Sequence, residues 1–501
     1  MIDVELQVLG WQLRAIAEEM GAVLVRSAFS PNIKERRDCS TAVFDEVGRM
    51  VAQAEHIPVH LGAMPEAVAA VMAHDPQPGE IWILNDPYAG GTHLPDITTV
   101  ARTPLGFAVT RAHHADIGAP EPGSLPAGSR TLADEGVVIP PTRLDDEMLE
   151  SLVARMRNPE ERRGDLRAQL AAHRLAEQRL AELCTRRGTT RVAAAMDELL
   201  AYSERVVRAA IRDLPDGRFE AAETLESEDG ELVIRAAVEI SGDAITIDFA
   251  GSAEQYAGNL NCPLAVTRSA AYFVIRCLTD PDLPASGGAF APVTVTAPAG
   301  CLVNARSPAA VAAGNVETSS RIVDVLLAAF GHALPVPAQG QGTMNNVVLG
   351  SERFTYYETI AGGQGACPDA EGPSAVHVAM TNTLNTPIEA LELAYPLRVE
   401  RYALRLGSGG AGEHRGGDGV VRELRVLEPC SLSVLAQRRA RAPRGRAGGA
   451  DGAPGRTLVN GEDLPASASR QLAAGDVIRI ETPGGAGYGT AADDARESSN
   501  A

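Results

Sequence analysis

Lysine is nearly absent from this chain of 501 residues, which has a single one, Lys34. A P-loop needs a lysine directly after a glycine-rich turn, and no such turn precedes Lys34 in the stretch NIKER at 32–36. Pyridoxal and other Schiff-base chemistry also needs a reactive lysine. Lys34 is the one residue that could supply it, and it is a weak candidate. If ATP takes part in the reaction, this chain does not bind it through a P-loop.

Paired cysteines and long apolar runs are missing as well. The seven cysteines are scattered without a CxxC pair, which excludes a zinc ribbon or a disulfide scaffold and predicts reduced, mostly buried thiols. The longest apolar stretches, such as 325–330, are far shorter than the roughly 20 residues that span a bilayer. The N-terminus begins MIDVE, acidic and without the basic start of a secretory signal. We therefore expect a cytoplasmic protein.

Positive charge is in deficit. The chain has 45 basic and 65 acidic residues, a formal net charge of −20. The negative electrostatic potential of such a chain repels nucleic acid and anionic membranes, so we expect neither as a partner. The hydrophobic content of 45% is ordinary for a globular protein, and the length predicts about two to four domains.

The order of periodic patterns predicts a mixed α/β, multidomain chain. Helical spacing runs through 4–28, and a long helical tract at 145–213 is interrupted near Gly188. From residue 402 onward, strands alternate with glycine turns. The expected divisions are an N-terminal α/β region with the candidate metal site at 1–215, a central α/β domain at 216–400, a β-rich region at 401–490, and a disordered tail at 491–501.

Histidine marks the most informative part of the sequence. Six of the ten histidines fall in the first quarter of the chain: His56, His60, His74, His93, His113 and His114. The sharpest pattern is GTHLPD at 91–96 followed by RAHHAD at 111–116. Two imidazoles with one or two carboxylates suit a divalent ion such as Zn²⁺, Mn²⁺ or Fe²⁺. The alternative is that these are loop histidines satisfied by backbone hydrogen bonds.

Neighbouring residues of a strand point to opposite faces, so only one of His113 and His114 is expected to be a ligand. A second charged stretch, 32–40, offers Asp38 as a further carboxylate and arginines for an anion, or is simply a solvated connection. We interpret Cys39 as a buried thiol, because no histidine lies near it in sequence. The polar stretch GNVETS at 314–319 either caps a helix or receives an anion there.

Several long strings resemble the hydantoinase B / 5-oxoprolinase family, which includes the B subunit of ATP-dependent N-methylhydantoinase. The strings run through nearly the whole chain in order: SPNIKERRDCS (30–40), HIPVHLG (56–62), NDPYAGGTHLPD (85–96), RAHHADIG (111–118), GVVIPP (136–141), GNVETSSR (314–321), QGTMNN (341–346), YYETIAGGQGA (356–366), the run MTNTLNTPIEALELAYPLRVERY (380–402) and ETPGGAGYG (481–489).

The resemblance implies one half of a two-subunit enzyme. A hydantoinase A-type partner binds ATP and phosphorylates a carbonyl oxygen, and the B-type subunit carries a divalent metal, Zn²⁺ or Mn²⁺, and opens the ring. Carried over by position, the metal ligands are Asp38, His93, Asp96 and one of His113 and His114, for which we take His114. His113 and Asp116 are then expected as catalytic proton carriers, and Arg37, or its neighbour Arg36, as a contact for the phosphate.

The expected activity is therefore that of a catalytic subunit of an ATP-dependent cyclic-amide hydrolase, acting on a hydantoin or lactam within a hetero-oligomer. One alternative is the equivalent subunit of an ATP-dependent acetone or acetophenone carboxylase, which usually needs a third small subunit. The other is a non-catalytic scaffold for the ATPase partner. An intact His/Asp cluster counts against the scaffold, and a lack of bound metal would favour it.

Overall fold

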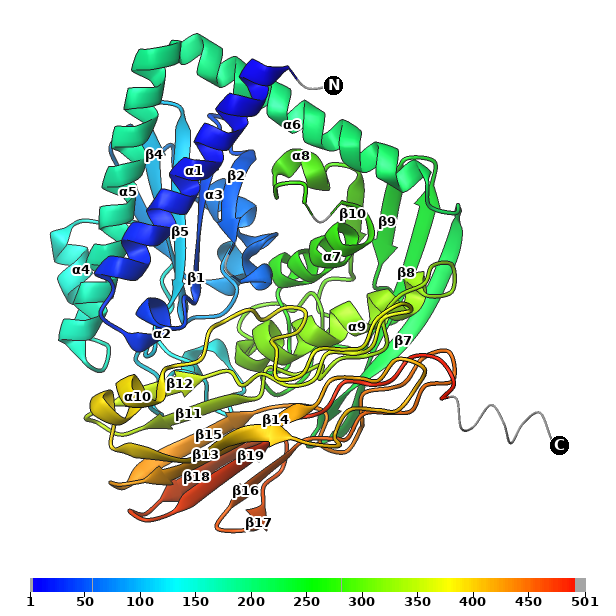
Figure 1. The fold of residues 1–501 in the computed structure, drawn as a ribbon. Helices are drawn as coiled ribbons and strands as arrows, with labels where there is room; N and C mark the ends of the chain where they lie inside the picture. The colour runs from blue at the N-terminus through cyan, green and yellow to red at the C-terminus, as the bar shows by residue number, and fades with distance from the viewer. Residues whose placement is uncertain (1–2, 56, 281, 492–501) are drawn as a thin grey trace.

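The computed structural model describes residues 3–55, 57–280 and 282–491 (Figure 1). Four sheets and the helices packed on them make up the described chain, which confirms the mixed α/β, multidomain prediction. The tail expected at 491–501 lies outside the described residues except for Ala491. Within the described part of the chain, none of the helices combines the length and apolar character that crossing a bilayer requires.

The first sheet is antiparallel throughout and has the order β2-β1-β5-β4-β3-β6. Its strands are β1 (Cys39–Phe44), β2 (Met50–Glu55), β3 (Ile81–Leu84), β4 (Asp96–Thr103), β5 (Gly106–His113) and β6 (Thr142–Arg143). Every residue of β1 and β5 is buried, because both faces of the sheet are covered. β4 and β5 form a hairpin whose far ends, Asp96 and His113, lie opposite each other.

One face of the first sheet packs on long helices (Figure 1). The helices of this half are α1 (Val4–Ser27), α2 (Pro31–Lys34), α3 (Ala63–Met72), α4 (Asp146–Val153), α5 (Pro159–Arg187) and α6 (Thr189–Arg212). The predicted apolar stripe of α1, from Leu6 to Leu24, is buried against this face. The predicted interruption near Gly188 is confirmed, since α5 ends there with a positive φ of 85° and α6 begins directly after.

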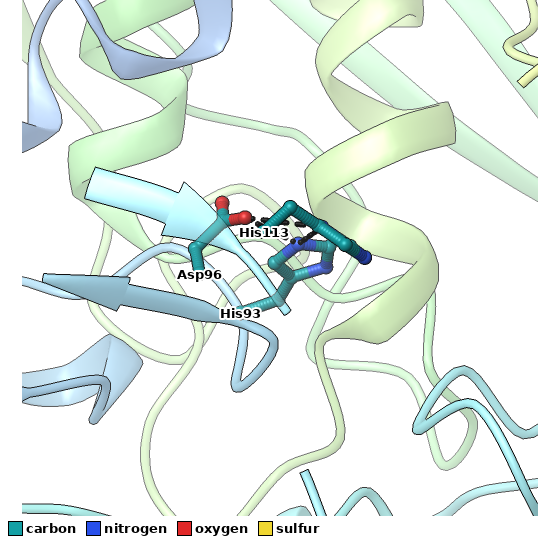
Figure 2. Close-up of side chains that lie close together, drawn as sticks. All are labelled: His93, Asp96 and His113. Atoms are coloured by element: carbon teal, nitrogen blue, oxygen red, sulfur yellow. Dashed lines mark hydrogen bonds and ion pairs between the residues drawn. The ribbon is translucent and has the colours of Figure 1, made fainter. Parts of the chain in front are cut away.

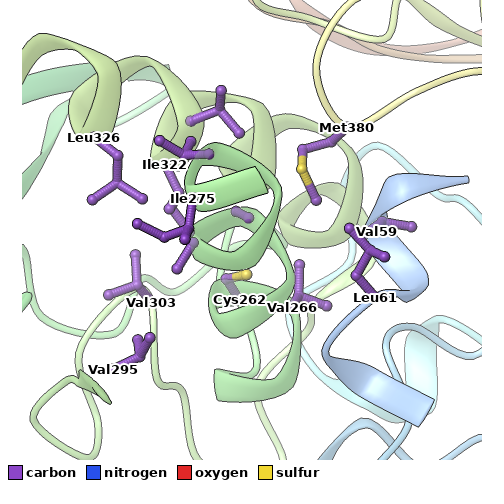
Figure 3. Packing of buried hydrophobic residues seen from close by; sticks show 14 of the residues in the cluster. Val59, Leu61, Cys262, Val266, Ile275, Val295, Val303, Ile322, Leu326 and Met380 are labelled. Atoms are coloured by element: carbon purple, nitrogen blue, oxygen red, sulfur yellow. The ribbon is translucent and has the colours of Figure 1, made fainter. Parts of the chain in front are cut away.

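The other face of the first sheet shares a core with the second sheet, β10-β9-β8-β7. This region contains β7 (Gly217–Ser227), β8 (Gly230–Ser241), β9 (Ala244–Asp248), α7 (Leu264–Leu278), α8 (Gly287–Phe290), β10 (Val293–Thr296) and α9 (Ser319–Phe330). Figure 3 shows residues of this core, with Val59, Leu61 and Met380 close to Val266 of α7. The segments that carry these residues are therefore anchored by apolar burial.

The C-terminal part contains two further sheets, of order β12-β11-β15-β18 and β13-β14-β19-β16-β17. Their elements are β11 (Asn346–Gly350), β12 (Thr355–Glu358), α10 (Ile388–Ala394), β13 (Leu397–Arg405), β14 (Gly419–Val426), β15 (Cys430–Leu435), β16 (Arg456–Val459), β17 (Glu462–Asp463), β18 (Ser467–Leu472) and β19 (Val477–Glu481). The boundary expected between residues 400 and 401 falls inside β13. The third sheet takes strands from both sides of that boundary, so the two regions are joined through it.

Candidate metal centre

Three side chains meet at the ends of β4 and β5 (Figure 2). His93 Nε2 lies 3.1 Å from Asp96 Oδ1 and 3.2 Å from His113 Nδ1. His113 Nδ1 lies 3.1 Å from Asp96 Oδ1, so the three atoms form a nearly equilateral triangle. All three residues are buried.

Local structure explains how these residues meet. Asp96 begins β4 and His113 ends β5, and the two are direct partners in the antiparallel register. Side chains that face each other across such a pair come within about 5 Å. His93 joins them from the tight turn before β4, where its carbonyl accepts a hydrogen bond from the Asp96 amide at 3.1 Å.

The size of the triangle fits one divalent ion. Donors bound at about 2.0–2.2 Å in tetrahedral geometry lie about 3.3–3.6 Å apart, slightly more than the observed 3.1–3.2 Å. The set of two imidazoles and a carboxylate is common for Zn²⁺ and Mn²⁺. Residues 93, 96 and 113 therefore have the chemistry and the spacing for such an ion.

A cavity of about 20 Å³ adjoins the triangle and is lined by Asp38 and His60 besides the three residues. This volume admits one water-sized species. Asp38 and Asp96 place two buried carboxyl groups beside the cavity, enough to balance the charge of a dication. Asp38 also contacts His113 directly, because its carbonyl accepts the His113 amide hydrogen at 3.0 Å.

Several buried polar atoms around this cavity have no hydrogen-bond partner among the described residues. They are His93 Nδ1, His113 Nε2 and the carboxamide oxygen of Asn315. The two ring nitrogens are those outside the triangle, and the other nitrogen of each ring faces Asp96. Leaving a buried polar group unpaired costs stability.

Electrostatics within the triangle favour an ionised carboxylate. Burial works against charge on Asp96, but His93 and hydrogen bonds from His113 and His60 outweigh it and lower its pKa well below the usual range. Burial also opposes charge on His93, yet the Asp96 carboxylate outweighs it and raises the His93 pKa. For His113, burial dominates and lowers the pKa. A neutral His113 keeps a lone pair for a metal.

His60 was not singled out by the sequence, although it lies in the string HIPVHLG. Its Nε2 is 3.5 Å from Asp96 Oδ2, and its Nδ1 is 2.9 Å from the Ser40 hydroxyl. Its neighbours Val59 and Leu61 are core residues (Figure 3), which holds the imidazole in place. Asp96 is thus fixed from the side opposite the triangle, as carboxylate ligands of metals often are.

Tyr357 on β12 supports the triangle from the C-terminal half. Its ring stacks on His113 with 4.6 Å between centroids and 17° between planes. Its hydroxyl donates to Asn346 Oδ1 at 3.0 Å, and the Asn346 amide donates to Glu317 Oε1 at 2.9 Å. The guanidinium of Arg36 lies over the same ring, 4.9 Å from its centre. These contacts hold the His113 imidazole in one orientation.

The prediction of His114 as the ligand does not agree with the geometry. His114 directs Nε2 toward Gln169 Oε1 on α5, at 3.1 Å, and burial lowers its pKa to about 4. It follows the last residue of β5, so its side chain points to the opposite face from His113. His113, placed by the sequence among the catalytic residues, lies in the triangle with His93 and Asp96 instead.

Asp116 is also misplaced as a proton carrier. Its carboxylate accepts hydrogen bonds from the amides of Gly118, Gly123 and Arg157 and from the Arg157 guanidinium, at 2.8–3.3 Å. It does not line the cavity. Asp116 therefore fixes a loop.

Arg37 does not line the cavity: its side chain is exposed, and its backbone adopts a positive φ of 56°. The alternative, Arg36, is fully buried beside the cavity. Its guanidinium donates to the Tyr357 carbonyl at 3.0 Å and to the hydroxyls of Thr359 and Thr383 at 2.7 and 3.2 Å. Arg36 thus holds cavity-lining residues in place. Cys39 is a fully buried thiol, as interpreted from the sequence.

Residues 3–491 match the family described as hydantoinase B/oxoprolinase. The chain belongs to this family. Among its relatives, 5-oxoprolinase 1 of Arabidopsis thaliana is 36% identical over 533 residues, which cover 97% of this chain but only 42% of that protein. An uncharacterized protein of Methanocaldococcus jannaschii is 39% identical over 513 residues, 98% of this chain and 91% of that protein.

Among solved structures, an ATP-dependent caprolactamase from Pseudomonas jessenii shares the fold of this hydantoinase B/oxoprolinase family member. The TM-score is 0.90 with 28% sequence identity, over 98% of this chain and 92% of that chain. The family and the fold therefore agree along the whole length of the described chain.

Proposed function

We propose that this chain is the catalytic subunit of an ATP-dependent cyclic-amide hydrolase. In this proposal it opens a hydantoin or lactam ring after a partner ATPase has phosphorylated the carbonyl oxygen. The observation that carries the proposal is the buried triangle of His93, Asp96 and His113, in a chain that resembles a caprolactamase over its whole length.

Two findings support a partner that binds ATP. The chain has one lysine and no P-loop. The same region occurs within a 5-oxoprolinase more than twice as long, and also as nearly the whole of the Methanocaldococcus jannaschii relative. We therefore assign the nucleotide site to a separate hydantoinase A-type chain, which corresponds to the remainder of the longer relatives.

The proposed chemistry starts from the low reactivity of an amide. Phosphorylation of the carbonyl oxygen makes the carbonyl carbon electrophilic. The oxygen of water then adds to this carbon, and the C–N bond breaks as the nitrogen takes up a proton. The acyl phosphate that remains is hydrolysed by a second water, which gives the carboxylate and releases phosphate. A divalent ion bound at the triangle supplies Lewis acidity, which lowers the pKa of water toward neutrality.

The residues of this chain hold and shield the reacting centre. His93, Asp96, His113 and Asp38 provide nitrogen and oxygen donors for the ion. His60 and Thr92 fix the Asp96 carboxylate, the latter with a hydroxyl donating to Oδ2 at 2.5 Å. The site is buried, which keeps bulk water away from a phosphorylated substrate.

The test is coexpression with the hydantoinase A-type partner, metal analysis, and turnover of a panel of lactams, hydantoins and ketones with ATP. We expect a bound divalent metal and ATP-dependent release of a ring-opened amino acid from a cyclic amide. The double variant His93→Ala/Asp96→Ala serves as the control that lacks both ligands. Bicarbonate-dependent use of acetone or acetophenone would favour the carboxylase instead. A metal-free complex with full ATPase activity would favour the scaffold.

A further inference from the structure

A π-helical turn precedes α9 and reaches the candidate metal centre. It comprises Gly314–Thr318 (η4), and the ribbon of α9 passes beside His113 in Figure 2. Turns of this kind insert one extra residue into a helix and are frequent at functional sites. Gly314 makes the turn possible, since a Cβ there would lie 1.7 Å from the carbonyl oxygen of Asn261. The backbone is therefore shaped to bring the next residue to the cavity.

That next residue, Asn315, has a carboxamide without a partner. Asn315 is 3% exposed and lines the same cavity as Asp38, His93, Asp96 and His113. Its Oδ1 is buried and accepts no hydrogen bond from the described residues. An unpaired carbonyl oxygen at a buried site is destabilising unless something occupies the space before it.

The volume of the cavity limits what that occupant can be. About 20 Å³ admits a single ion or a single water beside the triangle. Carboxamide oxygens are good ligands for hard cations such as Mn²⁺, whereas Zn²⁺ is usually complete with four donors. His93, Asp96 and His113 supply three donors that lie within 4.8 Å of one another, and Asp38 lines the same cavity, so an added carboxamide oxygen matters most to an ion that prefers six ligands.

We propose that Asn315 is a further oxygen ligand of the candidate metal centre and selectively strengthens the binding of six-coordinate ions. The inference shares one assumption with the proposed function, namely that a divalent metal binds at the triangle. It assigns a residue far along the chain to a centre whose other donors come from the first sheet. Asn315 lies within the π-turn, a kind of turn that is frequent at functional sites.

The test uses the full-length chain, stripped of metal with a chelator and titrated separately with Mn²⁺ and Zn²⁺. For Asn315→Leu, which matches the size of asparagine, we expect Mn²⁺ affinity to fall at least tenfold and Zn²⁺ affinity less than threefold. Asn315→Asp restores an oxygen donor and should keep Mn²⁺ affinity at or above the wild-type value. The electron paramagnetic resonance spectrum of bound Mn²⁺ should change in the leucine variant and be largely recovered in the aspartate variant.

Ser320→Ala is the matched control, because Ser320 is buried on α9, donates to the Val316 carbonyl and does not line the cavity. It should leave both affinities unchanged. Unchanged Mn²⁺ affinity in Asn315→Leu, or an equal loss for both ions, overturns the inference. If the leucine variant does not fold, loss of Mn²⁺ affinity in Asn315→Asp overturns it as well. None of these titrations needs ATP, partner or substrate, so failed turnover in the coexpressed complex would refute the proposed function and leave this result standing.

Discussion

Asp96 and His113 face each other across β4 and β5, with their nearest side-chain atoms 3.1 Å apart. The contact depends on register alone, since Asp96 is the first residue of one strand and His113 the last of its neighbour. A shift of one residue would bring His114 to Asp96 and turn His113 toward α5. Strand pairing thus decides which of the two histidines faces Asp96.

The first prediction follows from this register. His113→Ala should lower the affinity for Zn²⁺ or Mn²⁺ on the order of 100-fold, because it removes a donor from the triangle. His114→Ala, the matched control, loses only the contact with Gln169 and should bind metal within threefold of the wild type. Both variants should be destabilised by about 2 kcal/mol, since both histidines are buried. Calorimetric metal titration and thermal denaturation measure the two effects separately, and equal metal loss in both variants would contradict the assignment.

Sequence patterns predicted part of the cluster at the candidate metal centre. HxxD at 93–96 and the histidine pair at 113–114 pointed to the loop and the strand whose side chains meet in the structure, because short-range spacing and strand alternation are visible in a sequence. The sequence favoured His114 as the ligand, whereas His113 faces Asp96 in the structure, because this orientation depends on where β5 ends. The position of Asp116 could not be predicted for the same reason: β5 stops at His113, so alternation does not extend to residue 116.

Residues that arrive from far along the chain could not be predicted. Tyr357 stacks on His113 from the third sheet, and no local pattern indicates that contact. Asn315 lies on a π-turn, which breaks the 3.6-residue periodicity on which helix prediction depends. The stretch at 314–319 was read as a cap or an anion site, whereas its asparagine faces a cavity lined by histidines and carboxylates.

A second prediction concerns His60. His60→Ala should lower metal affinity by about 10- to 100-fold, because outer partners of a ligating carboxylate contribute on this scale. The affected contact is the one between His60 Nε2 and Asp96 Oδ2 at 3.5 Å. His74→Ala is the control, since His74 is exposed and stacks on Trp82. Metal titration of both variants checks the expectation, and wild-type affinity in His60→Ala would refute it.

A third prediction uses the buried Glu135. Burial raises its pKa from 4.5 to about 7, against hydrogen bonds from the amides of Ala312 and Val311 and from the Ser129 hydroxyl. Because the folded-state pKa is the higher one, the stabilising effect is complete below pH 4.5 and is lost as the pH rises through 7. The loss amounts to about 3 kcal/mol at most.

Glu135→Gln removes this titration. In metal-free protein, the free energy of unfolding by urea should therefore fall less steeply from pH 5 to 8 in the variant than in the wild type. The difference between the two proteins should level off above pH 7, where Glu135 is ionised in both the folded and the unfolded state. Parallel curves over the whole range would show that Glu135 does not titrate there.

The last prediction concerns the chain on its own. Without the ATPase partner it should hydrolyse neither ATP nor lactams, because it has no P-loop and cannot activate the amide. With a coexpressed hydantoinase A-type partner, we expect coelution in size-exclusion chromatography and ATP turnover that rises when a cyclic amide is added. A phosphorylated amide is lost to water on release, so its transfer requires a lasting interface, and such interfaces commonly bury upward of about 2,000 Å². Light scattering of the eluted complex gives its stoichiometry. Robust ATP turnover by the isolated chain, or a stable monomer that never coelutes with the partner, would contradict a divided enzyme in which this chain holds only the metal half of the chemistry.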